Sequence, residues 1–269
     1  MTGRTRNFYL IPYAAWMLLF VAAPIALIVY YSLFDIEGKF SFTNYQKFLS
    51  PIYLKMTLYS FWYALLITLF SLLVAYPTAY ALTRTKHKQL WLLLIVLPSW
   101  INLLLKTYAF LGLFGTYGLT NAILETLGLG THQILFTDFS FIFVSVYIFI
   151  PFMILPIFNA LEDMNSSLLD ASRDLGASAW ITFRRVIFPL TLGGVKAGCQ
   201  AVFIPALSLF MITRLIAGNR VITLGTAIEQ HFLVTQDWGM GSAIAVVLII
   251  VMALVMIATG ERKRGVKDA

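Results

Sequence analysis

The stretch DASRDLGASAWITFRRVIFPLTLGG, residues 170–194, interrupts a chain that is otherwise strongly apolar. Of the 269 residues, 60% are hydrophobic and 12% are charged, and that charged share is about half the value usual in soluble domains. The mean hydropathy is +0.84. Since backbone groups in a bilayer must be hydrogen-bonded internally, we expect membrane-spanning helices, with residues 170–194 as a loop between two of them.

Six apolar stretches have the length needed to cross a hydrocarbon core of about 30 Å, each with about 20 to 27 residues. They are Phe8–Phe34, Leu58–Leu82, Leu90–Phe114, Phe139–Leu161, Val195–Ala217 and Met240–Thr259. Runs of this length favour helices over barrel strands. The first run is longer than the core of a signal peptide, which predicts a retained span. The sequence therefore predicts an all-α integral membrane protein with six transmembrane helices.

Lys and Arg residues gather in one set of loops. This set contains Arg4, Arg6, Arg84, Lys86, Lys88, Arg173, Arg184, Arg185, Lys196, Arg262, Lys263, Arg264 and Lys267, and the opposite set contains Lys39, Lys47, Lys55 and Arg220. Cytoplasmic loops carry an excess of basic residues. We therefore expect a multi-pass protein of the cell membrane with both termini in the cytoplasm. This bias accounts for the net charge of +7. We therefore expect membrane lipid and not nucleic acid as a partner of the basic residues.

Several kinds of chemistry have no sequence support. There is no GxxxxGK[ST] phosphate loop, no HExxH and no CxxC motif. The histidines, His87, His132 and His231, are expected in different loops, and Cys199 is the single cysteine. No acidic residue lies near the centre of a span, where a proton-driven pump usually needs one. We expect a non-catalytic protein without a metal site; a stand-alone carrier or channel remains an alternative.

The loop itself is predicted to form two short helices. The first is expected to begin at Ser167 and to stop near Gly176, a residue that suits the left-handed position after a helix end. The second is expected to run from Ser178 to Pro189, and the pair Gly193-Gly194 to turn the chain into the fifth span. From spacing alone, the loop could be a helix that docks in a groove on a partner protein or an amphipathic segment that lies on lipid headgroups.

The pattern in this loop resembles the EAA loop of ABC-transporter permeases. That loop has an E-A-A triplet, then a glycine, and later an aliphatic residue before F-P or L-P. Here Asp170-Ala171-Ser172 corresponds to the triplet, Gly176 to the glycine and Ile187-Phe188-Pro189 to the ending. Asp in place of Glu and Ser in place of the second Ala are departures from the pattern.

The resemblance implies a MetI-like type I importer permease. Its core would cover residues 58–260, after a first transmembrane helix and outer segment in 1–57 and before a basic cytoplasmic tail in 261–269. A cytoplasmic coupling helix would lie between transmembrane helices 4 and 5. Its ATPase-contacting residues would be Asp170, Ala171, Ser172, Arg173, Asp174, Leu175, Gly176 and Ala177.

The resemblance also implies the partners of this chain. They are a second homologous permease subunit, two copies of a cytosolic ABC ATPase and an extracytoplasmic substrate-binding protein. ATP and Mg would be bound by the ATPase, so this chain would hold no cofactor.

Five further stretches resemble the B-type permeases of spermidine/putrescine import systems. They are LPSWINLLLKTYAFLGLF (97–114), SRDLGAS (172–178), FPLTLGGVKAGC (188–199), PALSLF (205–210) and EQHFLVTQDWGMGSA (229–243). This resemblance implies spermidine and putrescine as the solutes. Permeases for sulfate, iron or other small solutes share the loop and remain the alternative.

Polar and aromatic residues within two spans predict a translocation path, since polar side chains in spans usually face a cavity or the bundle interior. The predicted lining residues are Trp100, Asn102, Lys106, Gln200, Phe203 and Phe210. Aromatic faces suit a polycation. Asn102 and Lys106 are expected on one helix face, and Gln200, Phe203, Leu207, Phe210 and Arg214, which recur at spacings of three and four residues, are expected to form one stripe of the fifth span. Lys106 and Arg214 would repel a polyamine unless they are turned away, snorkelled to the interface or paired. For Arg214 we favour snorkelling to the interface, and for Lys106 pairing with a carboxylate of the partner permease or the binding protein is the alternative. On these residues alone, an anionic solute fits at least as well as a polyamine.

Overall fold

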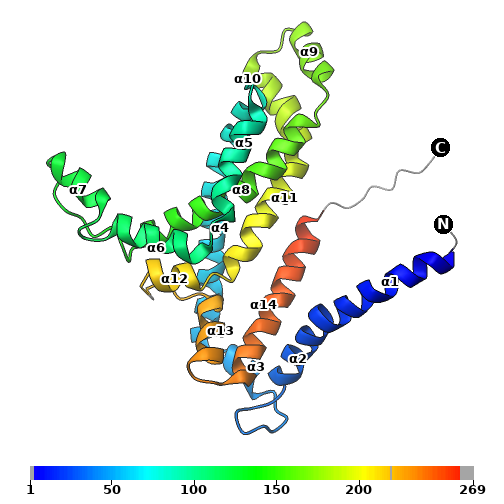
Figure 1. Ribbon diagram of the computed structural model, residues 1–269, viewed down its shortest axis with the longest axis vertical. Helices are drawn as coiled ribbons and strands as arrows, with labels where there is room; N and C mark the ends of the chain where they lie inside the picture. Colours follow the sequence, from blue (N-terminus) through cyan, green and yellow to red (C-terminus); the bar gives the residue numbers. More distant parts are fainter. Residues whose placement is uncertain (1–2, 219, 261–269) are drawn as a thin grey trace.

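The computed structural model describes residues 3–218 and 220–260, and every regular element in this part of the chain is a helix (Figure 1). The predicted basic tail, residues 261–269, lies outside the described residues. Five helical segments are long and apolar enough to cross a membrane, and one bent helix pair makes a sixth if its two halves count as one span. The predicted all-α membrane architecture is therefore confirmed.

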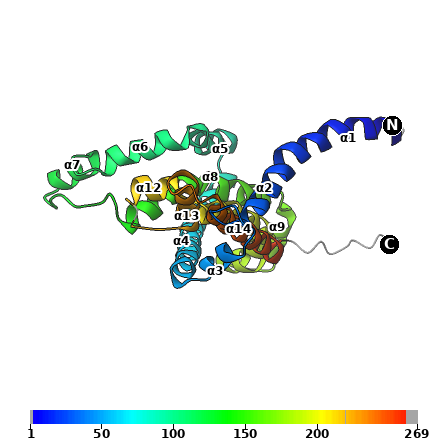
Figure 2. The ribbon, with the colours of Figure 1, turned by 90° about the horizontal axis from the view of Figure 1, so that it is seen from below.

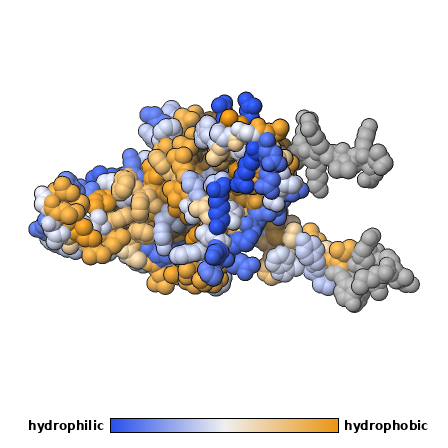
Figure 3. Space-filling view, turned by 90° about the horizontal axis from the view of Figure 1, so that it is seen from above, coloured by the Kyte–Doolittle hydropathy of each residue, from blue (hydrophilic) through white to orange (hydrophobic). Residues whose placement is uncertain are grey.

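Three long helices lie side by side at the centre of the molecule (Figure 1). They are α4 (Pro51–Thr83), α8 (Asp138–Glu162) and α11 (Phe188–Leu207). Their shared core includes the fully buried side chains of Ile67, Phe141, Met153, Ile154 and Ile157. Seen from the end that carries α9, hydrophilic residues gather over the bundle and apolar residues surround them (Figure 3), which suits a membrane.

Close packing of α8 on α11 depends on glycine. A Cβ added at Gly194 would lie 2.5 Å from the Cβ of Ala160 and 2.5 Å from the carbonyl oxygen of Pro156, and one added at Gly198 would lie 2.8 Å from Sδ of Met153. Small residues let membrane helices approach closely. The prediction that the pair Gly193-Gly194 forms a turn is therefore wrong, because both residues lie inside α11.

The first span stands apart from this centre. It consists of α1 (Gly3–Met17), the π-helical turn η1 (Leu18–Ala22) and α2 (Ala23–Ser32), and the apolar window in Leu10–Ser32 has no buried residue. α2 packs against α14 (Trp238–Thr259), whereas α1 projects away from the bundle (Figures 1 and 2). The short α3 (Thr43–Phe48) connects this unit to α4 and also touches α14.

The predicted third span, Leu90–Phe114, is not one straight helix. α5 (Lys88–Val96) and the 3-10 turn η2 (Leu97–Trp100) are followed by α6 (Leu103–Phe114) and α7 (Leu119–Thr126), and the two halves meet at 91°. Ile101 and Asn102 have extended backbone conformations, just after Pro98, which lacks an N–H group. As a result, α6 and α7 extend from one side of the bundle and α1 from the other (Figure 2).

The predicted fifth span, Val195–Ala217, begins and ends too late in the chain. The observed helical run is Ala179–Leu207: α10 (Ala179–Thr182), the π-helical turn η3 (Phe183–Ile187) and α11. Pro189 does not end a helix as predicted. It lies inside one helical run, directly after the π-helical turn η3, and such local adjustments let a membrane helix tolerate the missing N–H of a proline. The helix ends two residues after Pro205, and α12 (Met211–Ile216) and α13 (Leu224–Leu233) follow as separate short helices.

Candidate coupling loop and translocation path

The predicted coupling loop lies at one end of the molecule, and α13 lies near the opposite end (Figure 1). Its first helix is α9 (Ser166–Asp174). The helix begins one residue earlier than predicted, because Asn165 and not Ser167 is its N-cap residue. The side-chain oxygen of Asn165 accepts a hydrogen bond from the backbone N–H of Ser167 at 3.0 Å. An Asn at this position satisfies one of the otherwise unpaired N–H groups of a helix start.

The end of α9 agrees with the prediction. Gly176 has a φ of +74°, and a Cβ there would meet nothing within 4 Å. The glycine is therefore needed for the left-handed backbone and not for space. Its N–H donates to the carbonyl of Arg173 at 2.8 Å. The second helix begins after Ser178, as predicted, and the hydroxyl of Ser178 accepts from the N–H of Ile181.

The helices α9 and α10 with the turn between them, residues 166–182, form an elbow that is held together by one contact and fixed to the bundle by another. The hydroxyls of Ser172 and Thr182, both buried, are hydrogen-bonded at 2.8 Å and join α9 to α10. The ring of Phe183 stacks on Trp180 and meets the ring of Tyr76 on α4 edge-on, with ring centroids 5.7 Å apart in each pair. A displacement of α9 would therefore be passed to α10, to η3 and to the part of α4 around Tyr76.

Most of the predicted coupling residues are open to a partner. The side chain of Leu175 is 88% exposed, and an exposed ion pair of 3.3 Å joins Arg173 to Asp170. Ser172 is different, because its side chain is buried in the elbow's own packing. Ala177 is half-buried.

The predicted path residues of the third span surround its bend. Trp100 is 74% exposed. Asn102 caps α6, with its side-chain oxygen accepting from the N–H of Leu104 at 2.8 Å, so it does not share a helix face with Lys106 as predicted. Lys106 lines a small, mainly apolar cavity of about 210 Å³ together with Ser99 and Tyr147. Among the described residues, Lys106 has no ion-pair partner.

The predicted stripe of the fifth span is divided between two elements. The side-chain amide of Gln200 donates to the hydroxyl of Thr259 on α14. The ring of Phe203 packs on the ring of Phe61 on α4, with the ring centroids 6.0 Å apart. Phe210 lies beyond the end of α11, immediately before α12, and is partly exposed. The structure therefore does not bring Gln200, Phe203 and Phe210 together on one helix face.

Arg214 forms an ion pair, whereas snorkelling to the interface was the arrangement favoured from the sequence. Its guanidinium donates to Oε1 of Glu229 at 2.9 Å, and the Glu229 side chain is 15% exposed.

Within the part of the chain that the structure describes, no cluster of His, Cys, Asp and Glu could hold a metal ion.

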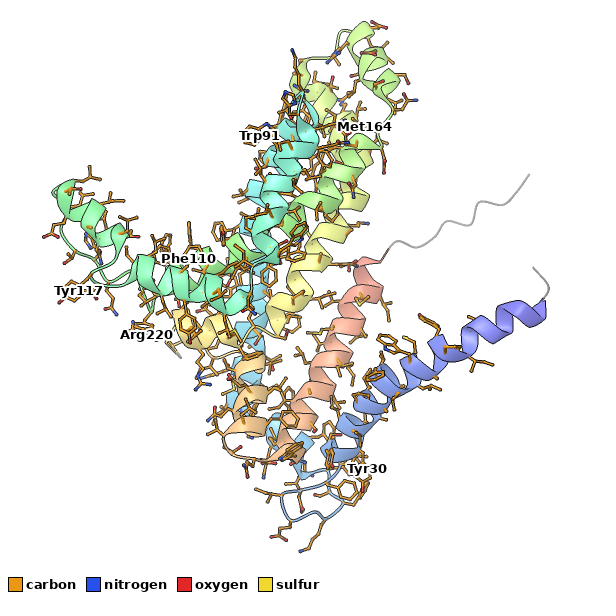
Figure 4. All side chains as sticks on the ribbon, in the orientation of Figure 1. Tyr30, Trp91, Phe110, Tyr117, Met164 and Arg220 are labelled. Atoms are coloured by element: carbon orange, nitrogen blue, oxygen red, sulfur yellow. The ribbon has the colours of Figure 1, made fainter. Side chains whose placement is uncertain are left out.

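The sequence analysis missed a larger cavity of about 610 Å³. Its lining residues come from α4, from the start of α8 and from the segment before α13: Tyr59, Tyr63, Phe136, Thr137, Asp138, Arg220, Val221 and Ile222. Arg220 is seen below α6 in Figure 4. The single signal in the sequence was an acidic residue, Asp138, at the beginning of a span.

No family model matches the chain. Individual relatives do. The chain is 35% identical over 266 residues to the spermidine/putrescine transport system permease protein PotB of Salmonella typhimurium, covering 95% of this chain and 93% of the relative. It is 36% identical over 259 residues to PotB of Escherichia coli, covering 93% and 94%. The inner membrane ABC transporter permease protein YdcU of E. coli is 29% identical over 236 residues, covering 82% and 75%.

Solved structures show the same fold. A chain of the bacterial alginate ABC transporter, crystallised in complex with an alginate pentasaccharide-bound periplasmic protein, superposes with a TM-score of 0.81 at 15% identity, covering 95% of this chain and 92% of the other. A second structure of a bacterial ABC transporter, involved in alginate import, gives a TM-score of 0.73 at 15% identity, covering 98% and 96%. Taken with the identity to PotB over nearly the whole length, these matches show that the chain belongs to the ABC-transporter permease family of spermidine/putrescine transport systems.

Proposed function

We propose that this chain is the transmembrane permease subunit of an ATP-driven importer for spermidine and putrescine, and that it forms half of the translocation path. The observation that carries the proposal is the identity to PotB proteins, 35% or 36% over more than nine-tenths of the chain. The exposed helix α9 and its tie to α4 support a mechanical role.

In this proposal, residues 170–177 dock on a cytosolic ABC ATPase, of which the assembly holds two copies. A second homologous permease subunit completes the path, and an extracytoplasmic binding protein delivers the solute. Closure of the ATPase pair on ATP moves both coupling helices and turns the bundle from inward-facing to outward-facing. ATP and Mg are bound by the ATPase, so this chain binds no cofactor and catalyses no reaction.

The proposal includes a topology. Residues 58–260 form the permease core in the cell membrane, residues 1–57 supply the first helix and an outer segment, and both termini lie in the cytoplasm. The basic loops support this orientation. A reporter that is active only in the cytoplasm, fused after Arg264, should give a signal, and a signal from a reporter active only outside the cell would contradict the topology.

The decisive experiment is solute uptake by the complete assembly in proteoliposomes. We expect ATP-dependent uptake of labelled spermidine that unlabelled putrescine inhibits and sulfate or iron does not. Omission of the ATPase should abolish uptake. ATP-independent uptake by this chain alone would identify a stand-alone carrier or channel, and inhibition by sulfate or iron in place of putrescine would identify a permease for another solute.

A further inference from the structure

The cavity of about 610 Å³ has the size of a small-molecule site, since such sites usually measure roughly 300–1,000 Å³. Its walls come from chain segments that are far apart in the sequence: Tyr59 and Tyr63 from α4, residues 136–138 at the start of α8, and residues 220–222 before α13. Asp138 begins α8, whose other end leads into α9, and Tyr59 and Tyr63 lie in the first half of α4, away from Tyr76, which contacts Phe183 beside the coupling loop. The cavity therefore lies toward the side from which a solute would enter in the proposed topology.

One wall holds an oriented carboxylate. The hydroxyl of Tyr63 donates to Oδ1 of Asp138 at 3.1 Å. The Tyr63 ring is fixed in turn by an edge-on contact with the buried Phe141, with ring centroids 5.3 Å apart. Among the described residues Asp138 forms no ion pair. Since an ionised carboxylate has acceptor sites on both oxygens, it has capacity left for a cationic donor.

The aromatic wall is held in an unusual backbone conformation. Phe136 has a φ of 64°, and its N–H donates to the carbonyl of Ile216 at 2.9 Å. A Cβ added at Gly218 would lie 2.6 Å from Cδ1 of Phe136, so this glycine leaves room for the ring. A bulky residue at positive φ is strained, and such strain is concentrated at sites that bind or switch.

We propose that this cavity receives one primary ammonium group of a polyamine on its way into the membrane path. The inference rests on the proposed function, and it names the site at which the solute first meets this chain. An ammonium group would pair with Asp138 and lie against the faces of Tyr59 and Phe136, whose quadrupoles attract cations.

Arg220 limits the number of ammonium groups that the cavity can bind. Its side chain also lines the cavity, so the lining holds one carboxylate and one guanidinium. A single carboxylate in a lining that also holds a guanidinium suits one ammonium group, and the other amines of the solute must extend out of the cavity. An anion in this cavity would be repelled by the carboxylate of Asp138 and by the negative faces of the aromatic rings. A cation is therefore favoured over an anion.

The chain allows a direct test with thiol reagents, because Cys199 is its single cysteine. In the complete assembly, Cys199→Ser removes the native thiol and Ile222→Cys introduces one in the cavity lining. A cationic methanethiosulfonate should react with the Ile222→Cys thiol about tenfold faster than an anionic one, and putrescine should slow the reaction. Adding Asp138→Asn should abolish both effects.

The matched control removes an acidic residue on the same side of the membrane outside the cavity. Glu125→Gln on the exposed α7 should leave both the charge selectivity and the protection by putrescine unchanged. Faster reaction with the anionic reagent, absence of protection, or equal effects of Glu125→Gln and Asp138→Asn would overturn the site.

Uptake by the assembly separates this inference from the proposed function. Asp138→Asn should lower the spermidine uptake rate about tenfold while the binding protein still stimulates ATP hydrolysis, and Tyr63→Phe should lower uptake less. Undiminished uptake by Asp138→Asn in an assembly that imports spermidine would refute the site alone. An unsubstituted assembly that does not import polyamines would refute the proposed function, and protection of the thiol by putrescine would then still decide on the site.

Discussion

Substitution of Gly194 by Ala should weaken the contact between α8 and α11. The added Cβ would lie 2.5 Å from two atoms, the Cβ of Ala160 and the carbonyl oxygen of Pro156. Ordinary carbon contacts are about 3.5–4.0 Å, so the helices must separate locally by about 1 Å. The Pro156 oxygen belongs to the backbone and cannot rotate away, so the two helices themselves must move.

The size of the effect follows from two opposing terms. Overpacking of a filled site costs about 1–3 kcal/mol, and backbone on both sides places this site near the upper end. Alanine in place of glycine within a helix recovers about 1 kcal/mol. The net loss is about 2 kcal/mol, which lowers the melting temperature of a chain of this size by about 6 °C.

Thermal unfolding of the purified protein in detergent, followed by tryptophan fluorescence, would measure this shift. Gly112→Ala is the matched control, because Gly112 lies within α6 and a Cβ there would meet nothing within 4 Å. This control should melt at the same or a slightly higher temperature. A melting temperature of Gly194→Ala equal to that of the control would refute the close approach of α8 and α11.

Three further predictions concern the elbow, His231 and the path. Gly176→Asp places a side chain at φ +74° on the proposed docking face and should uncouple ATP hydrolysis from uptake or prevent assembly; normal coupled uptake would contradict docking there. Burial lowers the pKa of His231, which is hydrogen-bonded to Tyr53 at 2.8 Å. The unfolded chain then binds the proton first, so stability should fall as pH drops below about 6.5, and His231→Asn should flatten this dependence in melting curves; an unchanged curve would refute it. Phe203→Ala and Phe210→Ala should each lower spermidine uptake while the ATPase stays bound, and undiminished uptake would assign both rings to packing.

Span positions were predictable wherever a helix is uniformly apolar. The fourth span was expected at Phe139–Leu161 and is observed at Asp138–Glu162, and the sixth was expected at Met240–Thr259 and is observed at Trp238–Thr259. Each such helix satisfies its own backbone hydrogen bonds, so its length and hydropathy are local properties.

The two misplaced spans depend on information that hydropathy does not contain. The third span stays apolar through its bend, and the break at Ile101 and Asn102 depends on backbone conformation. The fifth span begins among charged residues, Arg184 and Arg185, which gave this part of the helix the character of a loop. Gly194 looked like a turn residue because its partner, α8, is distant in the sequence.

The candidate sites divide in the same way. The elbow was predictable because its signals, Gly176 and Ser178, act within a few residues of each other. The cavity around Asp138 was not, since its walls come from residues as far apart as Tyr59 and Ile222. The predicted path also failed as a stripe, because it assumed that α11 continues past Leu207.

The corrected course of the fifth span changes how the elbow would act. A helix that ended at Pro189 and turned at Gly193-Gly194 would leave the coupling loop flexibly attached. The helical run from Ala179 to Leu207 is continuous instead, with the π-helical turn η3 (Phe183–Ile187) in its path. Because a helix is stiff along its axis and α11 is packed on α8 through glycines, a push on α9 in the proposed assembly would move α11 and α8 together. Bending would then be concentrated at η3, where the regular hydrogen-bond ladder is interrupted.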